Sequence, residues 1–187
     1  MKRALKWIGI ALGILIVAGL IAFPLMRKNT KKHSPEQTAV YTSGNLSIQV
    51  NYSSPSKKGR VIFGELVPYG EVWRTGANEA TEFHTNQDLN IQGEHLPKGE
   101  YSLWTIPGER EWKVMFNKET GMWGLGFDGK ANRDPEKDRV EISVPRMETK
   151  NAYENLTLEF SDHGDLILSW DQTQIRIPIE ADASEPN

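Results

Sequence analysis

Residues 46–52 read LSIQVNY, and apolar side chains alternate strictly with polar ones along this stretch. The even positions hold leucine, isoleucine, valine and tyrosine, and the odd positions hold serine, glutamine and asparagine. Successive side chains of a β-strand point to opposite faces, so a period of two predicts a strand with one buried face and one wet face.

The same alternation recurs along the chain in short segments separated by turn residues. No window after residue 33 shows a sustained period of 3.6, which a helix would need. Short alternating strands at roughly 8–12-residue spacing predict an all-β fold, an antiparallel β-sandwich of about eight to ten strands. Pro178 places the last strand at a sheet edge or end. The segments are 60–63, 79–85, 89–91, 101–106, 112–116, 140–144, 156–160, 166–170 and 175–179.

The most unusual stretch follows the first strand, at residues 59–81, and reads GRVIFGELVPYGEVWRTGANEAT. Pro68, Gly70 and Gly76 are turn residues and favour a loop. Large aromatics, an arginine and an amide–carboxylate pair lie between them. We therefore expect a loop that is packed into the domain and that carries a candidate site.

The candidate ligand-binding residues are those whose chemistry suits a polar ligand. Arginine binds carboxylates or phosphates with two hydrogen bonds, although it also pairs with acids inside domains. An asparagine and a glutamate hydrogen-bond sugar hydroxyls, and asparagine equally serves turns. Aromatic faces in loops stack on ligands or fill the ends of a sandwich. The candidates are Arg60, Tyr69, Trp73, Arg74, Asn78, Glu79 and Trp123.

Two other interpretations of the same stretch remain open. Glu79 could act as a general acid or base in a hydrolase, which requires a second carboxylate about 5–10 Å away. Alternatively, the stretch is a packed plug and the domain acts through protein contacts. The first interpretation predicts a partner acid among Glu65, Glu71 and Asp128. Trp112 and Trp170, on alternating strands, are expected in the core.

The amino end predicts a membrane anchor. Residues 7–26 (WIGIALGILIVAGLIAFPLM) contain no charged residue, and a helix of this length spans roughly 30 Å, the thickness of a bilayer core. A signal peptide has a shorter apolar core and a small-x-small cleavage site, so an uncleaved single-pass anchor is favoured. Basic residues flank both ends, and their charge does not choose an orientation.

The charge of the chain differs between its basic amino end and its acidic remainder. Seven of the 22 basic residues lie before Ser34, which leaves 15 basic against 25 acidic residues, a net charge of −10. Such an acidic body is not expected to bind nucleic acid. There is no cysteine, and the four histidines are scattered, so neither a metal site nor a cofactor is predicted. The expected organisation is anchor 1–33, tether 34–44, β domain 45–180 and acidic tail 181–187.

Two motifs resemble a known family. KGRVIFGELVPYGEVWRTGANEAT at 58–81 and LPKGEYSLWTIPGEREWKVMFNK at 96–118 are similar to the bacterial family catalogued as domain of unknown function 2911. The similarity runs from about Asn45 to Ile179. It implies an extracytoplasmic β-rich domain behind a signal or anchor, in the periplasm or on the cell surface, and it implies no reaction. Ser54 departs from the basic residue common before the first proline, and the segment before Asp138 is longer than usual.

Together these observations predict a membrane-anchored extracytoplasmic β-sandwich. We expect it to bind a polar ligand of the cell envelope, a glycan or a peptide, through the loop at 59–81, without catalysis. The hydrolase using Glu79 and the structural module remain the alternatives.

Overall fold

A computed structural model describes residues 2–126 and 128–182 of the chain. It divides into helix α1 (Lys2–His33) and a separate compact domain that begins at Ser34. Among the described residues, no helix combines the length and the hydropathy needed to cross a bilayer. The residues expected to form an acidic tail fall largely at 183–187, outside the described residues.

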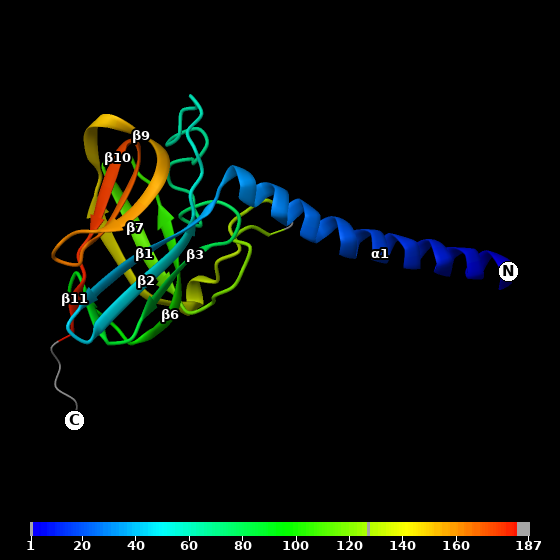
Figure 1. The fold of residues 1–187 in the computed structure, drawn as a ribbon, viewed down its shortest axis with the longest axis horizontal. Helices are drawn as coiled ribbons and strands as arrows, with labels where there is room; N and C mark the ends of the chain where they lie inside the picture. The colour runs from blue at the N-terminus through cyan, green and yellow to red at the C-terminus, as the bar shows by residue number, and fades with distance from the viewer. Residues whose placement is uncertain (1, 127, 183–187) are drawn as a thin grey trace. The chain divides into compact units, whose positions relative to one another are not determined.

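A six-stranded antiparallel sheet forms the body of the domain (Figure 1). Its strand order is β1-β2-β3-β6-β7-β8, so the strands that are neighbours in the sheet are mostly neighbours in the chain. The bounds are β1 Glu36–Ser43, β2 Leu46–Ser53, β3 Thr81–Thr85, β6 Gly99–Ile106, β7 Glu111–Asn117 and β8 Asp138–Pro145.

Two smaller sheets complete the domain. The long hairpin of β9 (Met147–Phe160) and β10 (Leu166–Ile177) is antiparallel with two irregularities of register in β10. The other sheet has the order β11-β4-β5 and joins the end of the chain to the middle of the sequence. Its strands are β4 Leu89–Ile91, β5 Glu94–Leu96 and β11 Glu180–Ala181; a 3-10 turn, η1, spans Pro135–Lys137.

One apolar core holds the sheets together. The alternating residues of β2 are buried at the even positions, as the period of two predicts, and they pack with the buried residues of β3, β6, β7, β8, β9 and β10. Trp112 and Trp170 are fully buried in this core, as expected. The prediction of an all-β, antiparallel fold is confirmed.

A second, smaller cluster covers the opposite face of the six-stranded sheet. Trp104 and Met115 point away from the main core and are nevertheless fully buried. Ala80 and the half-buried Val72 and Met122, which come from two loops, cover them. Both faces of β6 are therefore buried, which agrees with its sequence, YSLWTI, carrying large apolar side chains on both faces.

The structure differs from the expected tether. Residues 36–43 are not a linker but the edge strand β1, which pairs with β2 along its whole length from Glu36↔Ser53 to Ser43↔Leu46. The strand is mostly exposed, and its apolar residues are the three consecutive ones at 39–41, so no alternating apolar pattern marks it in the sequence. Ala39 and Tyr41 nevertheless pack against the main core.

The strand count also differs, with eleven strands in the described part of the chain rather than about eight to ten. The segments expected as strands at 166–170 and 175–179 are one strand, β10, which passes through bulges beside Asp171. The polar residues 171–174 (DQTQ) interrupt the apolar alternation, so the sequence did not indicate one continuous strand. Residues 60–63, expected as a short strand, lie instead in an irregular loop.

Proline substitutions in β1 test the edge-strand assignment. In an antiparallel edge strand, successive N–H groups face alternately toward the neighbouring strand and toward solvent, and proline is tolerated only where the N–H faces solvent. We expect one of Ala39→Pro and Val40→Pro to lower the free energy of unfolding by about 1 kcal/mol or more. The other should change it by less than about 0.5 kcal/mol.

The measurement is urea unfolding of the full chain, with Val40→Ala as the reference for Val40→Pro and the natural protein as the reference for Ala39→Pro. A flexible tether would tolerate both prolines equally, and equal, negligible effects would contradict the assignment.

Candidate functional site

The loop between β2 and β3, residues 54–80, carries most of the candidate residues and is irregular but packed. It joins two strands that are neighbours in the sheet, a connection for which a few residues would suffice. Ile62, Phe63 and Val67 are buried in the main core, and Thr75 and Asn78 are buried as well. The prediction of a loop packed into the domain is therefore confirmed.

The backbone of Trp73 pairs this loop with strand β6 of the sheet. β6 extends beyond the end of its pairing with β3, which stops at Thr81↔Leu103. There the Trp73 N–H donates to the Thr105 carbonyl at 2.7 Å, and the Thr105 N–H donates to the Trp73 carbonyl at 2.9 Å. The Gly70 N–H donates to the Pro107 carbonyl at 2.8 Å. The loop thus replaces β3 beside the end of β6 and satisfies backbone groups that would otherwise be unpaired.

The Trp73 ring belongs to a cluster of four aromatic rings. It stacks on Trp170 with ring centroids 6.0 Å apart, and it meets Phe63 and Trp112 edge-on at 6.0 and 6.2 Å. Its indole Nε1 donates to the Gly76 carbonyl at 3.0 Å. The structure places this candidate residue against the main core and uses its polar atom inside the loop.

Thr75 closes the turn after Trp73 in a left-handed conformation, with φ of 57°. A β-branched residue rarely adopts this conformation, so local contacts must hold it there. Its Oγ1 lies 3.2 Å from the Thr105 Oγ1, and its carbonyl accepts a hydrogen bond from the Thr81 Oγ1 at 2.8 Å. These contacts fix the direction in which residues 76–80 leave the turn.

Arg74 lies between this loop and the loop of residues 118–134. Its side chain passes the backbone of Gly124, where an added Cβ would lie 3.0 Å from the Arg74 Cβ and closer still to its Cδ. Burial lowers the pKa of Arg74, and the charge of Glu79 acts in the opposite direction. The Arg74 Nε is buried and makes no hydrogen bond to the described residues.

Asn78 has a structural position. Its φ is 61°, a left-handed value that asparagine tolerates better than most residues. Its Nδ2 lies 3.4 Å from both the Ser34 carbonyl and the Ser53 Oγ, so it ties the loop to the start and the end of the β1–β2 hairpin.

Arg60 and Tyr69 lie elsewhere on the loop. The exposed Arg60 donates from its guanidinium to the carbonyls of Lys57 and Ser56, at 3.0 and 2.6 Å, and so closes a local turn. The Tyr69 ring packs against Gly64, whose φ of 96° and close approach to the ring leave no room for a side chain. Trp123, half-buried, precedes Gly124 in the second loop.

Glu79 is the candidate residue that lines a hollow. The hollow has a volume of about 350 Å³ and lies beside the first residues of β1, the last of β2 and the first of β3. Thr38, Asn51 and Glu82 are cross-strand neighbours and form its sheet side, because Thr38 pairs with Asn51 and Asn51 with Glu82. The full lining is Glu36, Gln37, Thr38, Asn51, Tyr52, Ser53, Glu79, Ala80 and Glu82.

The structure therefore separates the candidate residues. Arg74 and Glu79 lie within electrostatic reach of each other, whereas Arg60 and Tyr69 line no part of the hollow. None of the acids expected as a partner for Glu79 lines it either; Glu36 and Glu82 do. The sequence indicated Asn51 only as part of the wet face of a strand. It gave no indication of Glu36, because that residue reaches the hollow through the pairing of β1 with β2.

No group of three or more His, Asp or Glu residues within the described part of the chain is arranged to hold a metal ion.

The fold and the loop together define a class of protein, an antiparallel β domain with a long, internally packed β2–β3 loop and an acidic hollow beside it. The family model described as "Protein of unknown function (DUF2911)" matches residues 34–179. The chain belongs to this family, as the motifs at 58–81 and 96–118 indicate. Comparisons with curated proteins and with solved structures found no match.

A matched pair of glycine substitutions tests the packing of Arg74. Gly121 and Gly124 lie in the same loop with φ of 74° and 84°, so alanine at either position costs the left-handed strain of about 1–2 kcal/mol. An added Cβ at Gly121 meets nothing within 4 Å, whereas at Gly124 it meets the Arg74 side chain. We expect Gly124→Ala to cost about 1–3 kcal/mol more than Gly121→Ala in urea unfolding.

A double substitution identifies the clash. Arg74→Ala removes the Cδ that the new methyl group would meet, so the extra cost of Gly124→Ala should shrink in that background. Equal costs for the two glycine substitutions would show that the Arg74 side chain does not lie against this loop.

The alkaline stability of the domain tests the environment of Tyr52. Burial raises the pKa of Tyr52 above its ordinary value of 10.0, an interaction with the backbone of Leu158 lowers this pKa, and the charge of Glu159 raises it further. The stability from this neutral tyrosine is present below pH 10 and is lost as the pH rises through the folded-state pKa. The pKa of Tyr101 is also raised above its ordinary value, chiefly by burial.

Tyr52→Phe should therefore lose less stability than the natural protein between about pH 9 and about pH 11, measured by urea unfolding. A variant that loses as much as the natural protein would contradict the assignment to Tyr52.

Proposed function

We propose that the protein is a membrane-anchored, extracytoplasmic β-sandwich domain that binds a polar ligand of the cell envelope, a glycan or a peptide fragment. The binding site is the hollow lined by Glu79. One observation carries the proposal: of the candidate residues in the unusual stretch, Glu79 lines a hollow of ligand size, about 350 Å³, while Trp73, Thr75 and Asn78 hold the loop in place.

The lining of the hollow suits a ligand rich in hydrogen-bond donors. Carboxylates of Glu36, Glu79 and Glu82 and amides of Gln37 and Asn51 surround it, and no lysine or arginine is among the lining residues. The Asn51 Oδ1 already accepts hydrogen bonds from Thr38 and Gln49, which fixes its orientation. Hydroxyl groups of a sugar or the ammonium group of a peptide fragment match this set of acceptors.

Residues 73–78 of the unusual stretch support Glu79 and do not line the hollow. Trp73 pairs the loop with β6, Thr75 turns it, and Asn78 ties it to Ser34 and Ser53. Arg74 places a positive charge near Glu79. A preorganised site of this kind binds with less ordering cost than a mobile loop would.

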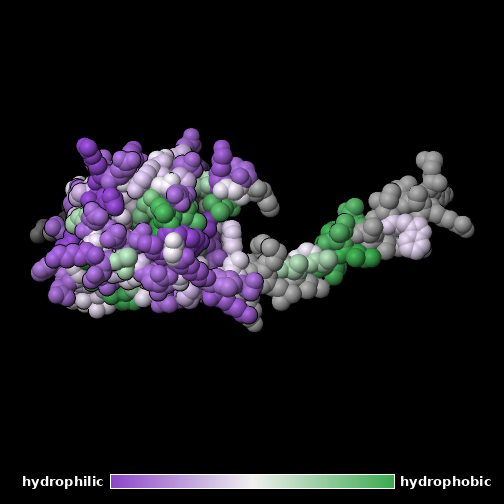
Figure 2. Space-filling view, turned by 90° about the horizontal axis from the view of Figure 1, so that it is seen from above, coloured by the Kyte–Doolittle hydropathy of each residue, from purple (hydrophilic) through white to green (hydrophobic). Residues whose placement is uncertain are grey.

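The surface of the domain is consistent with a polar partner. Figure 2 shows one face of the domain as largely hydrophilic, with small apolar patches between charged and polar residues. A large contiguous apolar area, which marks a hydrophobic docking surface, does not occur on that face.

The apolar run at residues 7–26 supports anchoring in a membrane. It has the length of a bilayer core and basic residues on both flanks. An anchor would hold the binding domain close to the envelope and raise its local concentration there.

One observation favours a hydrolase as the second candidate. Glu82 lines the same hollow as Glu79, so a second carboxylate is available for acid–base chemistry. The two functions differ in outcome, since a hydrolase releases product from a glycan or peptide and a binding domain returns it unchanged.

Thermal unfolding of the full chain with peptidoglycan fragments and defined glycans tests the binding proposal. A ligand at about 100 times its Kd adds about 2.7 kcal/mol to the stability of the folded state, which corresponds to several degrees in Tm. We expect such a shift for the natural protein and a much smaller one for Glu79→Gln. Glu65→Gln is the matched control, because Glu65 is exposed on the same loop and outside the hollow.

The variants also separate the alternatives. Product release that Glu79→Gln abolishes would establish the hydrolase. If no fragment shifts Tm and Glu79→Gln melts several degrees early, the hollow is part of the scaffold and the binding proposal fails.

A further inference from the structure

A second pocket lies at the other end of the β1–β2 hairpin. It has a volume of about 500 Å³ and is formed where the β1–β2, β3–β4 and β9–β10 turns meet the segment before β11. The hollow with Glu79 lies beside the first residues of β1, and this pocket lies at Tyr41 and Ser43, near its last residue. An eight-residue strand separates the two ends by roughly 20 Å.

Hydrogen bonds build the walls of this pocket. The Asn86 side chain clamps the β1–β2 turn, because its Oδ1 accepts from the Ser47 N–H at 2.7 Å and its Nδ2 donates to the Asn45 carbonyl at 2.8 Å. In the β9–β10 turn, the Gly164 N–H donates to the Ser161 carbonyl at 3.0 Å. The walls are therefore formed by fixed turns.

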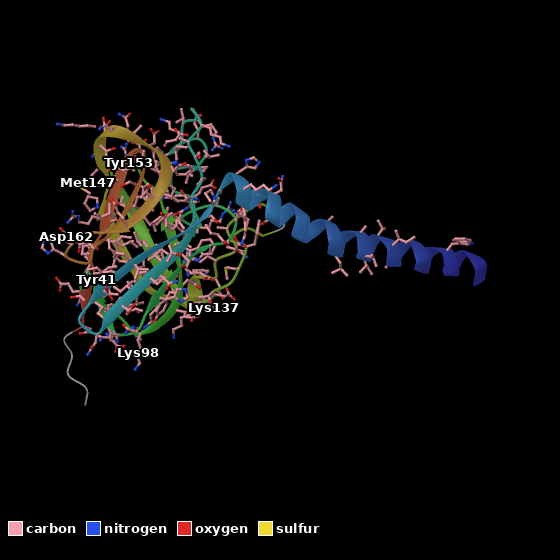
Figure 3. The ribbon with its side chains drawn as sticks, viewed as in Figure 1. Tyr41, Lys98, Lys137, Met147, Tyr153 and Asp162 are labelled. Atoms are coloured by element: carbon pink, nitrogen blue, oxygen red, sulfur yellow. The ribbon has the colours of Figure 1, made fainter. Side chains whose placement is uncertain are left out.

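Tyr41 is held in the pocket wall by close packing. Its ring contacts Phe160, with centroids 5.7 Å apart, and a Cβ added to Gly164 would lie 2.9 Å from its Cε1. Gly164 has φ of 94°, so glycine is required both for the backbone and for the approach of the ring. The ring stays partly exposed, and Figure 3 shows it below Tyr153, toward the end of the domain that carries β11 in Figure 1.

The remaining lining combines an apolar base with neutral polar groups. Leu46 and Ile179 are buried, whereas Asn45, Gln87 and His163 bring amide and imidazole groups that donate and accept hydrogen bonds. Glu180 is the single carboxylate among the lining residues, and none of them is a lysine or an arginine. This composition disfavours an anionic ligand.

We propose that this pocket is a second binding site and that it takes a neutral saccharide. The apolar C–H face of a sugar ring packs on an aromatic side chain, and its hydroxyls both donate and accept hydrogen bonds, as the amides and the imidazole do. A site with one aromatic platform, neutral amides and fixed walls matches that chemistry. The proposal does not depend on ligand binding at Glu79.

The test is a titration of the full chain with cellobiose, chitobiose and maltose, followed by backbone amide chemical shifts. The protein is kept in a polyoxyethylene detergent, which has no sugar headgroup. We expect at least one disaccharide to give saturable shifts at Asn45, Gln87 and Gly164, with a Kd below about 10 mM.

Two substitutions probe the pocket, and one serves as a control. Tyr41→Ala removes the ring and should weaken binding at least about tenfold. Gln87→Ala should weaken it several-fold and leave the fold intact, since the hydrogen bonds that join Gln87 to Thr85 use its backbone. Gln172→Ala, at an exposed position of β10 outside the pocket, should not change the Kd.

The absence of saturable shifts with all three disaccharides would overturn the proposal. So would binding that Gln87→Ala and Tyr41→Ala leave unchanged. Shifts confined to Gln37, Asn51 and Glu82 would also overturn it, while supporting the hollow beside Glu79 as the saccharide site.

Discussion

The backbone of Trp73 exchanges two hydrogen bonds with Thr105, and its ring joins Phe63, Trp112 and Trp170 in the main core. A connection as long as residues 54–80 has many backbone groups to satisfy and loses much conformational entropy when it is ordered. The pairing and the buried rings offset that cost. They let a long loop become part of the sheet, and the positions of Arg74, Thr75, Asn78 and Glu79 all follow from this anchor point.

Most of the unusual stretch therefore serves structure, and two adjacent residues of it, Glu79 and Ala80, line a surface hollow. Trp73 uses its indole N–H inside the loop, and Asn78 uses its side-chain amide to contact Ser34 and Ser53, so neither can offer the same atoms to a ligand without a rearrangement. Glu79 leaves the turn beside Glu36 and Glu82, which come from two strands of the sheet. We propose a binding domain because the loop is held in place by its own contacts and a polar hollow lies beside it.

The period of two predicted the buried faces of β2, β3 and β7 from the sequence, because a half-buried strand must alternate. It could not predict β1, whose mostly exposed side chains need no apolar pattern, nor the continuity of β10 through its bulges at Asp171. The turn residues and aromatics of 59–81 predicted a packed loop. Which of its side chains face outward depends on the pairing of Trp73 with β6 and on strand register. Neither can be predicted from the local spacing of residues in the sequence.

Hydrogen exchange at the Trp73 amide tests this account most directly. The loop has no regular secondary structure around this residue, so local conformation alone would leave the amide exposed to exchange. If the pairing with Thr105 anchors the loop, the Trp73 amide should exchange only on opening of the sheet, as slowly as the amide of Val114 in β7. Exchange at the rate of an unprotected loop amide would show that residues 54–80 are not built into the sheet, and the rigid placement of Glu79 would then have no support.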